Sequence, residues 1–207
     1  MSHIETDIVQ LSKDFLDAQV EDLRGSEDPQ AFQVLRSIDD ILGISLVDIP
    51  RDNSDKDLMA DYLSAACCVH RAVEVTFASS AWSAMYSSPL TEGTKLPSER
   101  DNRIEIVMLV HVTSERIETH TAAILRVDGK VRLSPWIVEG QENSVYSTGR
   151  IPEALKLGIN LSKRMPGEIL EALARAKEAL PLGRIVEMFV KQIREVRDQA
   201  QEAAKRN

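Results

Sequence analysis

Composition and charge predict a folded, acidic protein. Of the 207 residues, 43% are hydrophobic and 28% are charged, which is ordinary for a globular chain and unlike a disordered one. The formal net charge is −8, and no cluster of Lys and Arg is interleaved with aromatic residues. Because nucleic-acid phosphates would be repelled by such a chain, we expect no DNA or RNA partner.

Apolar runs and cysteines indicate the compartment. No run reaches the roughly 20 apolar residues of a membrane-spanning helix, and residues 1–7 lack the basic and apolar regions of a signal peptide. We therefore expect a cytoplasmic protein that does not contact a membrane. Cys67 and Cys68 are adjacent, which excludes a disulfide framework. We interpret them as small apolar residues in a reducing compartment, with a redox role as the alternative.

Residues 1–70 are expected to form helices. Spacings of four and three predict a first amphipathic helix with the apolar face Ile4, Ile8, Leu11, Phe15 and Ala18. A second helix is predicted from Asp28 onward, with Pro29 in its first turn and Gly43 at its end, and with the apolar positions Phe32, Leu35, Ile38 and Leu42. A third is predicted near residues 56–69, after a capping box formed by Ser54 and Asp57.

Residues 71–138 are expected to form an antiparallel sheet. Val73, Val75 and Phe77 alternate with polar residues, as in a half-buried strand. The segment 103–113 has apolar residues on both faces, which predicts a central strand. A tight turn at residues 114–115 would pair this strand with the next and set Val112 against Ile117, Val110 against Thr119, His111 against Glu118 and Ile106 against Ala123.

The dipeptide Asp128-Gly129 predicts a second hairpin turn. A plain two-residue turn would set Leu125 opposite Arg132, so we expect a three-residue bulged loop with Gly129 left-handed. That register would instead pair Leu125 with Val131 and Ala123 with Leu133.

Residues 150–207 are expected to form two short helices and a long one. Pro152, Pro166 and Pro181 each stand where a helix can begin, and Gly158 and Gly183 act as breaks. The long helix has a stripe of four-three spacing: Leu182, Val186, Phe189, Ile193, Val196, Ala200 and Ala203. The stripe suits self-association, and it suits packing within the chain equally well.

The expected fold class is therefore α+β, in one domain over residues 1–207. An antiparallel sheet of about four strands is flanked by N-terminal and C-terminal helices. Apolar residues on both sheet faces predict cover on both sides, or a dimer contact.

One group of polar side chains could carry chemistry. The predicted hairpin places His111 opposite Glu118 and beside His120, all on one face. Two imidazoles and a carboxylate suit a divalent metal ion or acid–base catalysis. The alternative is a solvated cross-strand charge pair with a polar neighbour, which is common on open sheet faces. No motif for an organic cofactor is present.

A second group lies beside the polar segment 87–102. Trp82, Arg100, Arg103 and Glu105 combine an aromatic ring with paired charges and could line a ligand pocket. The alternative is that Trp82 packs into the core while the charges hold the loop through salt bridges.

Three runs carry a resemblance: AVEVTFASSAW at residues 72–82, PSERDNRIEIVML at 97–109 and LSPW at 133–136. Together they resemble a family of uncharacterised microbial and phage-associated proteins, over about the central third of the chain. The resemblance implies no activity and assigns no catalytic residue.

The function expected from these patterns is a non-enzymatic binding or assembly module, with a mobile-element origin as one hypothesis. Its amphipathic terminal helices would contact a protein partner or a second copy of the chain. The alternative is a metal-assisted or acid–base enzyme centred on His111, Glu118 and His120. Convergence of these three side chains in a concave pocket would favour the enzyme, and an open face would disfavour it.

Overall fold

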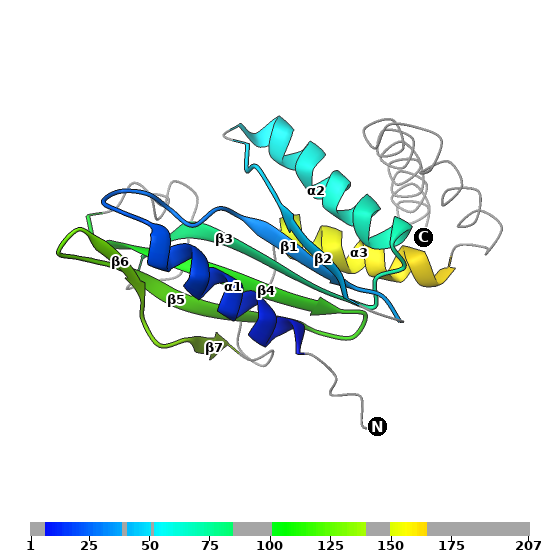
Figure 1. Ribbon diagram of the computed structural model, residues 1–207. Coiled ribbons are helices and arrows are strands. Elements are labelled where there is room, and N and C mark those ends of the chain that lie inside the picture. Colours follow the sequence, from blue (N-terminus) through cyan, green and yellow to red (C-terminus); the bar gives the residue numbers. More distant parts are fainter. Residues whose placement is uncertain (1–6, 39–40, 51, 85–100, 140–149, 165–207) are drawn as a thin grey trace, which may run out of the picture.

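The computed structural model describes residues 7–38, 41–50, 52–84, 101–139 and 150–164. These residues form a mixed α+β fold around an antiparallel sheet (Figure 1). The helices are α1 (Ile8–Asp22), α2 (Asn53–Val69) and α3 (Arg150–Arg164). The strands are β1 (Phe32–Arg36), β2 (Ile41–Leu46), β3 (Glu74–Ala84), β4 (Arg103–Thr113), β5 (Ile117–Val127), β6 (Lys130–Leu133) and β7 (Ile137–Glu139).

The sheet has seven strands in the order β2-β1-β3-β4-β5-β6, and β7 also pairs with β5. All pairings are antiparallel. The expected number of about four strands was too low, because β1, β2 and β7 were not foreseen. The expected class, an antiparallel sheet with helices, is confirmed.

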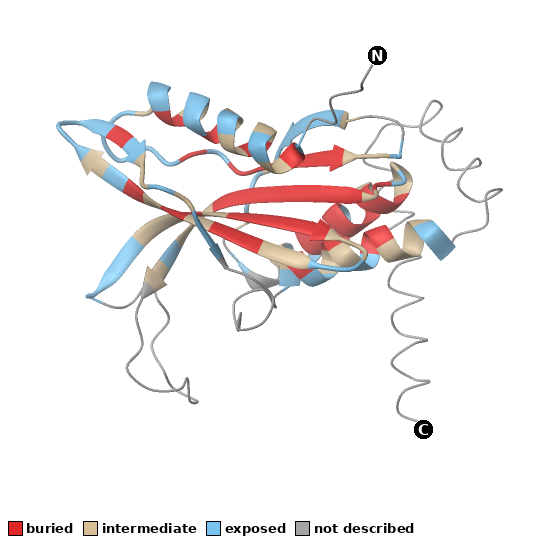
Figure 2. Ribbon diagram, turned by 90° about the horizontal axis from the view of Figure 1, so that it is seen from below, coloured by how far each residue is buried: buried red, intermediate tan, exposed pale blue. Residues whose placement is uncertain are grey.

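Helices cover both faces of the sheet, as the apolar residues on both faces predicted. α2 and α3 pack on one face, where Leu63 and Leu155 meet Phe77 and Val110 in one core. α1 packs on the other face, where Leu16 lies in a second core with Phe32, Leu109 and Ile124. The central strands are consequently buried along much of their length (Figure 2).

The helix predicted from Asp28 to Leu42 is wrong, because this segment forms the β1–β2 hairpin. β1 is buried on both faces, with Phe32 and Val34 toward α1 and Leu35 toward α2. A strand buried on both faces has no strict alternation of apolar and polar residues, so its spacing also fits a helix. Gly43 lies within β2 with a φ of 116° instead of ending a helix.

The β4–β5 hairpin has the predicted register. His111 pairs with Glu118, Val112 with Ile117, and Ile106 with Ala123. The backbone N–H of Thr113 donates to the carbonyl of Arg116 at 2.9 Å, which closes the two-residue turn.

The bulged loop predicted after β5 is wrong. Val127 pairs with Lys130 and Leu125 with Arg132, so the turn has two residues. Asp128 and Gly129 have φ values of 53° and 72°, and positive φ at both central residues is typical of a type I′ turn. The prediction assumed that Leu125 faces the core, but this side chain is 45% exposed, and the neighbouring Ile124 faces α1.

The two long N-terminal helices are largely where the spacing placed them. In α1, Ile8 is buried, and Leu11 and Phe15 are half-buried against the second core; Ala18 is exposed, and Ile4 lies outside the described residues. Asp52 caps α2 in place of the predicted Ser54, and its Oδ1 accepts from the N–H of Asp55 at 2.8 Å.

α3 runs without a break from Arg150 to Arg164, so Gly158 is not the helix break that was predicted. Gly158 instead marks a close approach of α3 to α2. A β-carbon built on Gly158 would lie 2.9 Å from Cβ of Cys67 and closer still to the carbonyl oxygen of Ser64. The helices predicted after Pro166 and Pro181, including the stripe that contains Ile193, lie outside the described residues.

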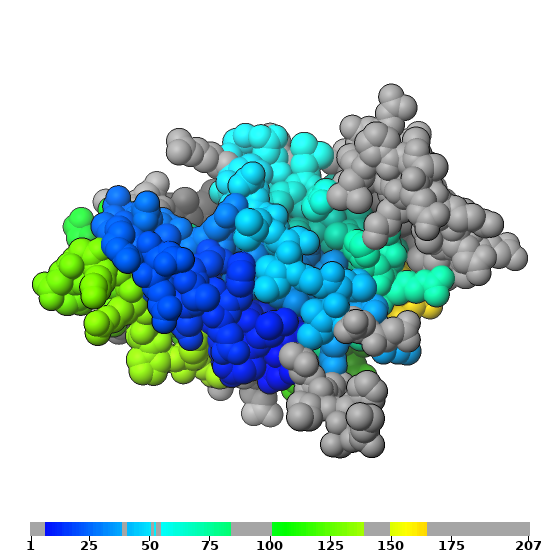
Figure 3. Space-filling view, in the orientation of Figure 1, coloured from blue at the N-terminus to red at the C-terminus, as the bar shows by residue number. Residues whose placement is uncertain are grey.

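β2 is an edge strand with an exposed apolar face, next to α1 on the surface shown in Figure 3. Leu42, Ile44 and Leu46 alternate along it and are all exposed. Within the described ranges, no helix has the length and apolar character needed to cross a membrane.

Candidate functional site

The α1 face of the sheet changes from apolar to charged toward the start of α1. On β3 the series is Ala78, Thr76 and Glu74, and on β5 it is Ile124, Ala122, His120 and Glu118, because alternate residues of a strand share a face. α1 begins above this region, where Oδ1 of Asp7 accepts from the N–H of Val9 at 2.9 Å. The charged residues therefore lie between the helix start and the sheet.

His111 is the centre of this charged region. It is 3% exposed, and each of its ring nitrogens meets a carboxylate. Nδ1 lies 3.1 Å from Oε2 of Glu118, and Nε2 lies 2.5 Å from Oε1 of Glu74. A neutral imidazole has a single N–H, so only the protonated ring donates to both carboxylates.

The ionisation of this group follows from the same contacts. Burial lowers the pKa of His111, but the hydrogen bonds and charges of Glu74 and Glu118 outweigh it and raise the pKa above its usual value. Burial likewise raises the pKa of Glu74, and the contacts with His111 and Arg36 outweigh it, so this pKa is lowered. The geometry thus favours an imidazolium between two carboxylates.

Three residues of this region were missed in the sequence. Glu74 bridges His111 and Arg36 through ion pairs, and it comes from β3 instead of the predicted hairpin. Arg36 was assigned to a helix that does not form. Arg116 extends the chain of charges at its other end, with Nη1 3.1 Å from Oε1 of Glu118. For Glu74, the signal available in the sequence was its alternation with Val75, which is typical of a strand.

His120 lies on the same face but is not part of the ion-pair chain. Its side chain is 94% buried, as its exposed fraction is 6%. Neither Nδ1 nor Nε2 has a hydrogen-bond partner among the described residues. Burial, followed by the charge of Lys13, lowers the pKa of His120, so that the ring favours its neutral form.

All three predicted side chains line one cavity of about 440 Å³, which we call the His120 cavity. They therefore share one recess beside the start of α1, and this recess is more open to solvent than enclosed. The residues that line it are Asp7, Val9, Gln10, Lys13, Arg36, Glu74, His111, Arg116, Glu118 and His120.

His111, Glu118 and His120 are not arranged as ligands of one metal ion. Both nitrogens of His111 are engaged by carboxylates, and in the described part of the chain no three His, Cys, Asp or Glu residues form a metal-binding group. The divalent metal suggested by His111, Glu118 and His120 stays a prediction from the sequence.

The second predicted group lies at the far end of β3 and β4. The guanidinium of Arg103 lies over the ring of Trp82, 4.5 Å from its centroid, and Trp82 is 40% exposed. Nε of Arg126 donates to Glu105 at 2.8 Å. The His120 cavity is not lined by Trp82, Arg103 or Glu105, and Arg100 lies outside the described residues. Their ligand pocket stays a prediction.

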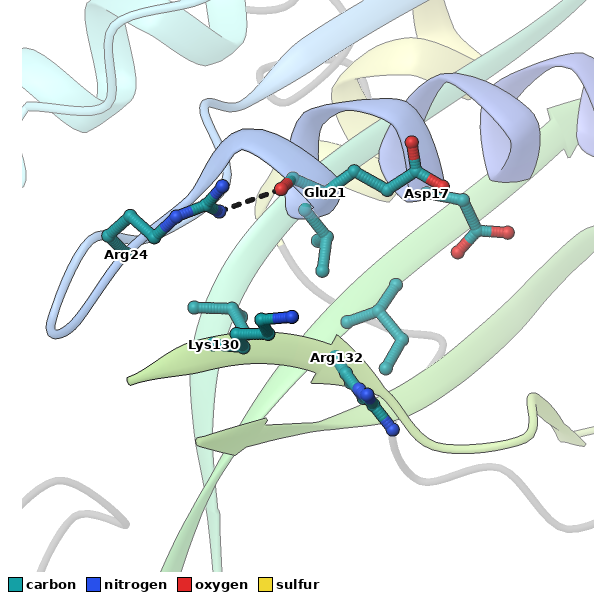
Figure 4. A pocket seen from close by; sticks show the side chains of 8 residues that line it. Asp17, Glu21, Arg24, Lys130 and Arg132 are labelled. Carbon is teal, nitrogen blue, oxygen red and sulfur yellow. Dashed lines mark hydrogen bonds between the residues drawn. The ribbon is translucent and has the colours of Figure 1, made fainter. Parts of the chain in front are cut away.

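Another cavity, of about 480 Å³, lies between the second half of α1 and β6 (Figure 4). Asp17 and Glu21 on the helix lie across from Lys130 and Arg132 on the strand. The Arg24 guanidinium donates to the carbonyl oxygen of Glu21 at 2.7 Å. Unlike the His120 cavity, its lining includes no buried side chain that lacks a polar partner among the described residues.

The cysteines are both buried and not joined in a disulfide. Burial raises the pKa of both thiols, that of Cys68 to about 11, which disfavours the thiolate needed for redox chemistry. Cys67 is a residue of α2 on its core side, where the amide of Gln33 donates to its sulfur at 3.6 Å.

No family model matches the chain, and no curated protein or solved structure gives a match. The resemblance to microbial and phage-associated proteins therefore stays a prediction.

Proposed function

We propose that the protein is a non-enzymatic binding module that holds a small polar molecule in the His120 cavity. One observation carries the proposal: His120 borders the cavity, is 94% buried, and has no hydrogen-bond partner on either ring nitrogen among the described residues. Buried polar groups in folded proteins are nearly always hydrogen-bonded, and exceptions often mark function.

The energetics support a ligand as the missing partner. Leaving a buried polar group unsatisfied costs about 1–3 kcal/mol. Both ring nitrogens are shielded from solvent as well as unpartnered among the described residues, so the proposal requires the ring to turn about its Cβ–Cγ bond until one nitrogen meets the bound molecule. The neutral ring offers one donor and one acceptor, so it suits a hydroxyl or an acid group on the ligand.

The surroundings of His120 favour binding over turnover. His111 is fixed by carboxylates on both of its nitrogens, and Glu74 and Glu118 are in turn paired with Arg36 and Arg116. A lining held by such a chain of ion pairs is preorganised, which reduces the entropy lost when a ligand binds. The volume also falls in the usual range of small-molecule sites.

A thermal-shift screen with a panel of small acids, amides, sugars and amines tests the proposal. At least one class should raise the melting temperature of the wild type and shift the ring signals of His120 in NMR spectra of ¹³C,¹⁵N-histidine-labelled protein. His120→Phe should lose both responses.

Thr119→Val is the matched control, because Thr119 is also buried without a side-chain partner but lies on the opposite face of β5. The control should keep the responses of the wild type. A panel that leaves the His120 signals unmoved would contradict the proposal, and so would binding that survives in His120→Phe.

The second candidate is an acid–base enzyme that uses the same cavity. It is favoured because His111, Glu118 and His120 line one cavity, and by the lowered pKa of His120, because a neutral imidazole can accept a proton at neutral pH. In that enzyme His120 would be the base. The sequence alone did not indicate which of His111 and His120 would have this role. Incubation of the wild type with each ligand from the screen, followed by mass spectrometry, distinguishes the two: new products support the enzyme, and unchanged ligand supports the binding module.

The protein partner or second copy expected from the sequence also stays a proposal. The exposed apolar face of β2 supports it, because an edge strand presents unpaired backbone groups to another chain. Light scattering on the wild type and on Ile44→Lys measures the contribution of this face. A mass that is monomeric in both proteins would contradict self-association through β2.

A further inference from the structure

The charges around the His120 cavity do not balance. With His111 protonated between its two carboxylates, the described residues of the lining carry four cationic side chains and three anionic ones. The excess is positive although the whole chain has a net charge of −8. Such a local reversal in an acidic protein indicates that the cavity favours an anion.

Lys13 of α1 is the cationic side chain of the described lining that stands outside the chain of ion pairs. Arg36 and Arg116 pair with Glu74 and Glu118, whereas no carboxylate of the described residues lies within ion-pair distance of Lys13. Its ammonium lies instead over the ring of Trp136, 5.3 Å from the centroid. Lys13 and His120 line the same cavity, and the positive charge of Lys13 helps to lower the pKa of His120.

We propose that the ligand of the His120 cavity is a small polar monocarboxylic acid, whose carboxylate is bound by the ammonium of Lys13 and an N–H of His120. This proposal rests on the proposed binding function. The carboxylate would supply the hydrogen-bond acceptor that His120 lacks and the anion that Lys13 lacks, both in one group.

The lining also argues for a single negative charge. Asp7, Glu74 and Glu118 would repel a second one, so a phosphate dianion or a dicarboxylate fits less well. Among the described residues that line the cavity, Val9 is the one apolar side chain, and Gln10 adds an amide. The rest of the ligand should therefore carry hydroxyl groups, which can donate to the carboxylates of the lining.

The test compares acids with amides of the same shape. Gluconate and lactate are titrated against gluconamide and lactamide, with inorganic phosphate as a further probe, and binding is followed through the ring signals of His120. At least one of the two acids should bind, and its amide should bind at least about tenfold more weakly, since charge-assisted hydrogen bonds are worth roughly twice neutral ones.

Lys13→Gln should remove this preference while Lys130→Gln keeps it. Lys130 is the matched control because it lines the other cavity, on β6. The pattern to expect is therefore a large loss of acid affinity in the first variant and an unchanged affinity in the second.

The outcomes separate this inference from the proposed function. Equal binding of acids and amides, or binding of phosphate alone, would overturn the monocarboxylate while the binding module stands. An acid preference that persists in Lys13→Gln would also overturn it. If neither these probes nor any molecule of the broader panel moves the His120 signals, both proposals fail.

Discussion

Replacing Gly158 by alanine sets two effects of opposite sign against each other. In the interior of a helix, alanine is more favourable than glycine by about 1 kcal/mol, so helix propensity alone predicts a more stable protein. In α3, however, the new β-carbon would meet the backbone of α2 at the carbonyl of Ser64, and Cβ of Cys67 at 2.9 Å. Only a shift of one helix away from the other relieves this contact, because a backbone carbonyl cannot rotate aside.

The steric effect should win. Overpacking of a buried contact costs about 1–3 kcal/mol, and here the displaced helix also carries the buried Leu155 and Ile159. Because the contact is with backbone, the upper part of that range applies, about 2–3 kcal/mol, and subtraction of the propensity gain of about 1 kcal/mol leaves a net loss of about 1–2 kcal/mol. For a chain of this length, that corresponds to a fall in melting temperature of roughly 2–8 °C.

Thermal unfolding followed by circular dichroism measures the change, with a urea titration to compare free energies. Ala18→Gly is the control, since Ala18 is exposed in α1 and reports helix propensity without a packing contact. The control should lose about 1 kcal/mol. A melting temperature of Gly158→Ala that equals or exceeds that of the wild type would refute the close approach of α2 and α3.

Two further predictions concern the turn after β5 and the charged centre. Gly129→Ala should destabilise the protein by roughly 1 kcal/mol in urea unfolding, because φ is +72°, whereas Gly129→Asn should be better tolerated; equal stability of all three proteins would count against the turn. Glu74→Gln should cost most between about pH 4.5 and 6.5. The lowered pKa of Glu74 gives stability that is fully present above pH 4.5 and is lost as the pH falls through the folded pKa. The raised pKa of His111 gives stability that is fully present below pH 6.5 and is lost as the pH rises through the folded pKa. Unfolding free energies of both proteins across pH 3–9 check this, and a difference independent of pH would contradict it.

The sequence predicted the β4–β5 hairpin well because local rules determine it. Once a two-residue turn follows Thr113, every pair is set by counting outward from the turn, and the pairing of His111 with Glu118 follows directly. The gathering of His111, Glu118 and His120 on one face was therefore predictable.

The rest of the site depends on contacts that no local rule specifies. Glu74 reaches His111 only through the β3–β4 register, and residues 85–102 separate these strands in the sequence. Arg36 depends on β1, whose burial on both faces concealed its strand character. The prediction of a bulge after β5 was wrong for a related reason. The face of β5 that enters the core is set by the packing of α1, which the local sequence does not specify.

The sheet between two cores gives this molecule an internal reference for spectroscopy. Leu109 faces α1 and stands directly opposite His120, whereas the next residue, Val110, faces the core under α2 and α3. A molecule that enters beside α1 should move the methyl resonances of Leu109 and leave those of Val110 in place. Two adjacent side chains of one strand thus report separately on the two halves of the protein. The difference between their chemical-shift changes removes any effect that is common to the whole fold.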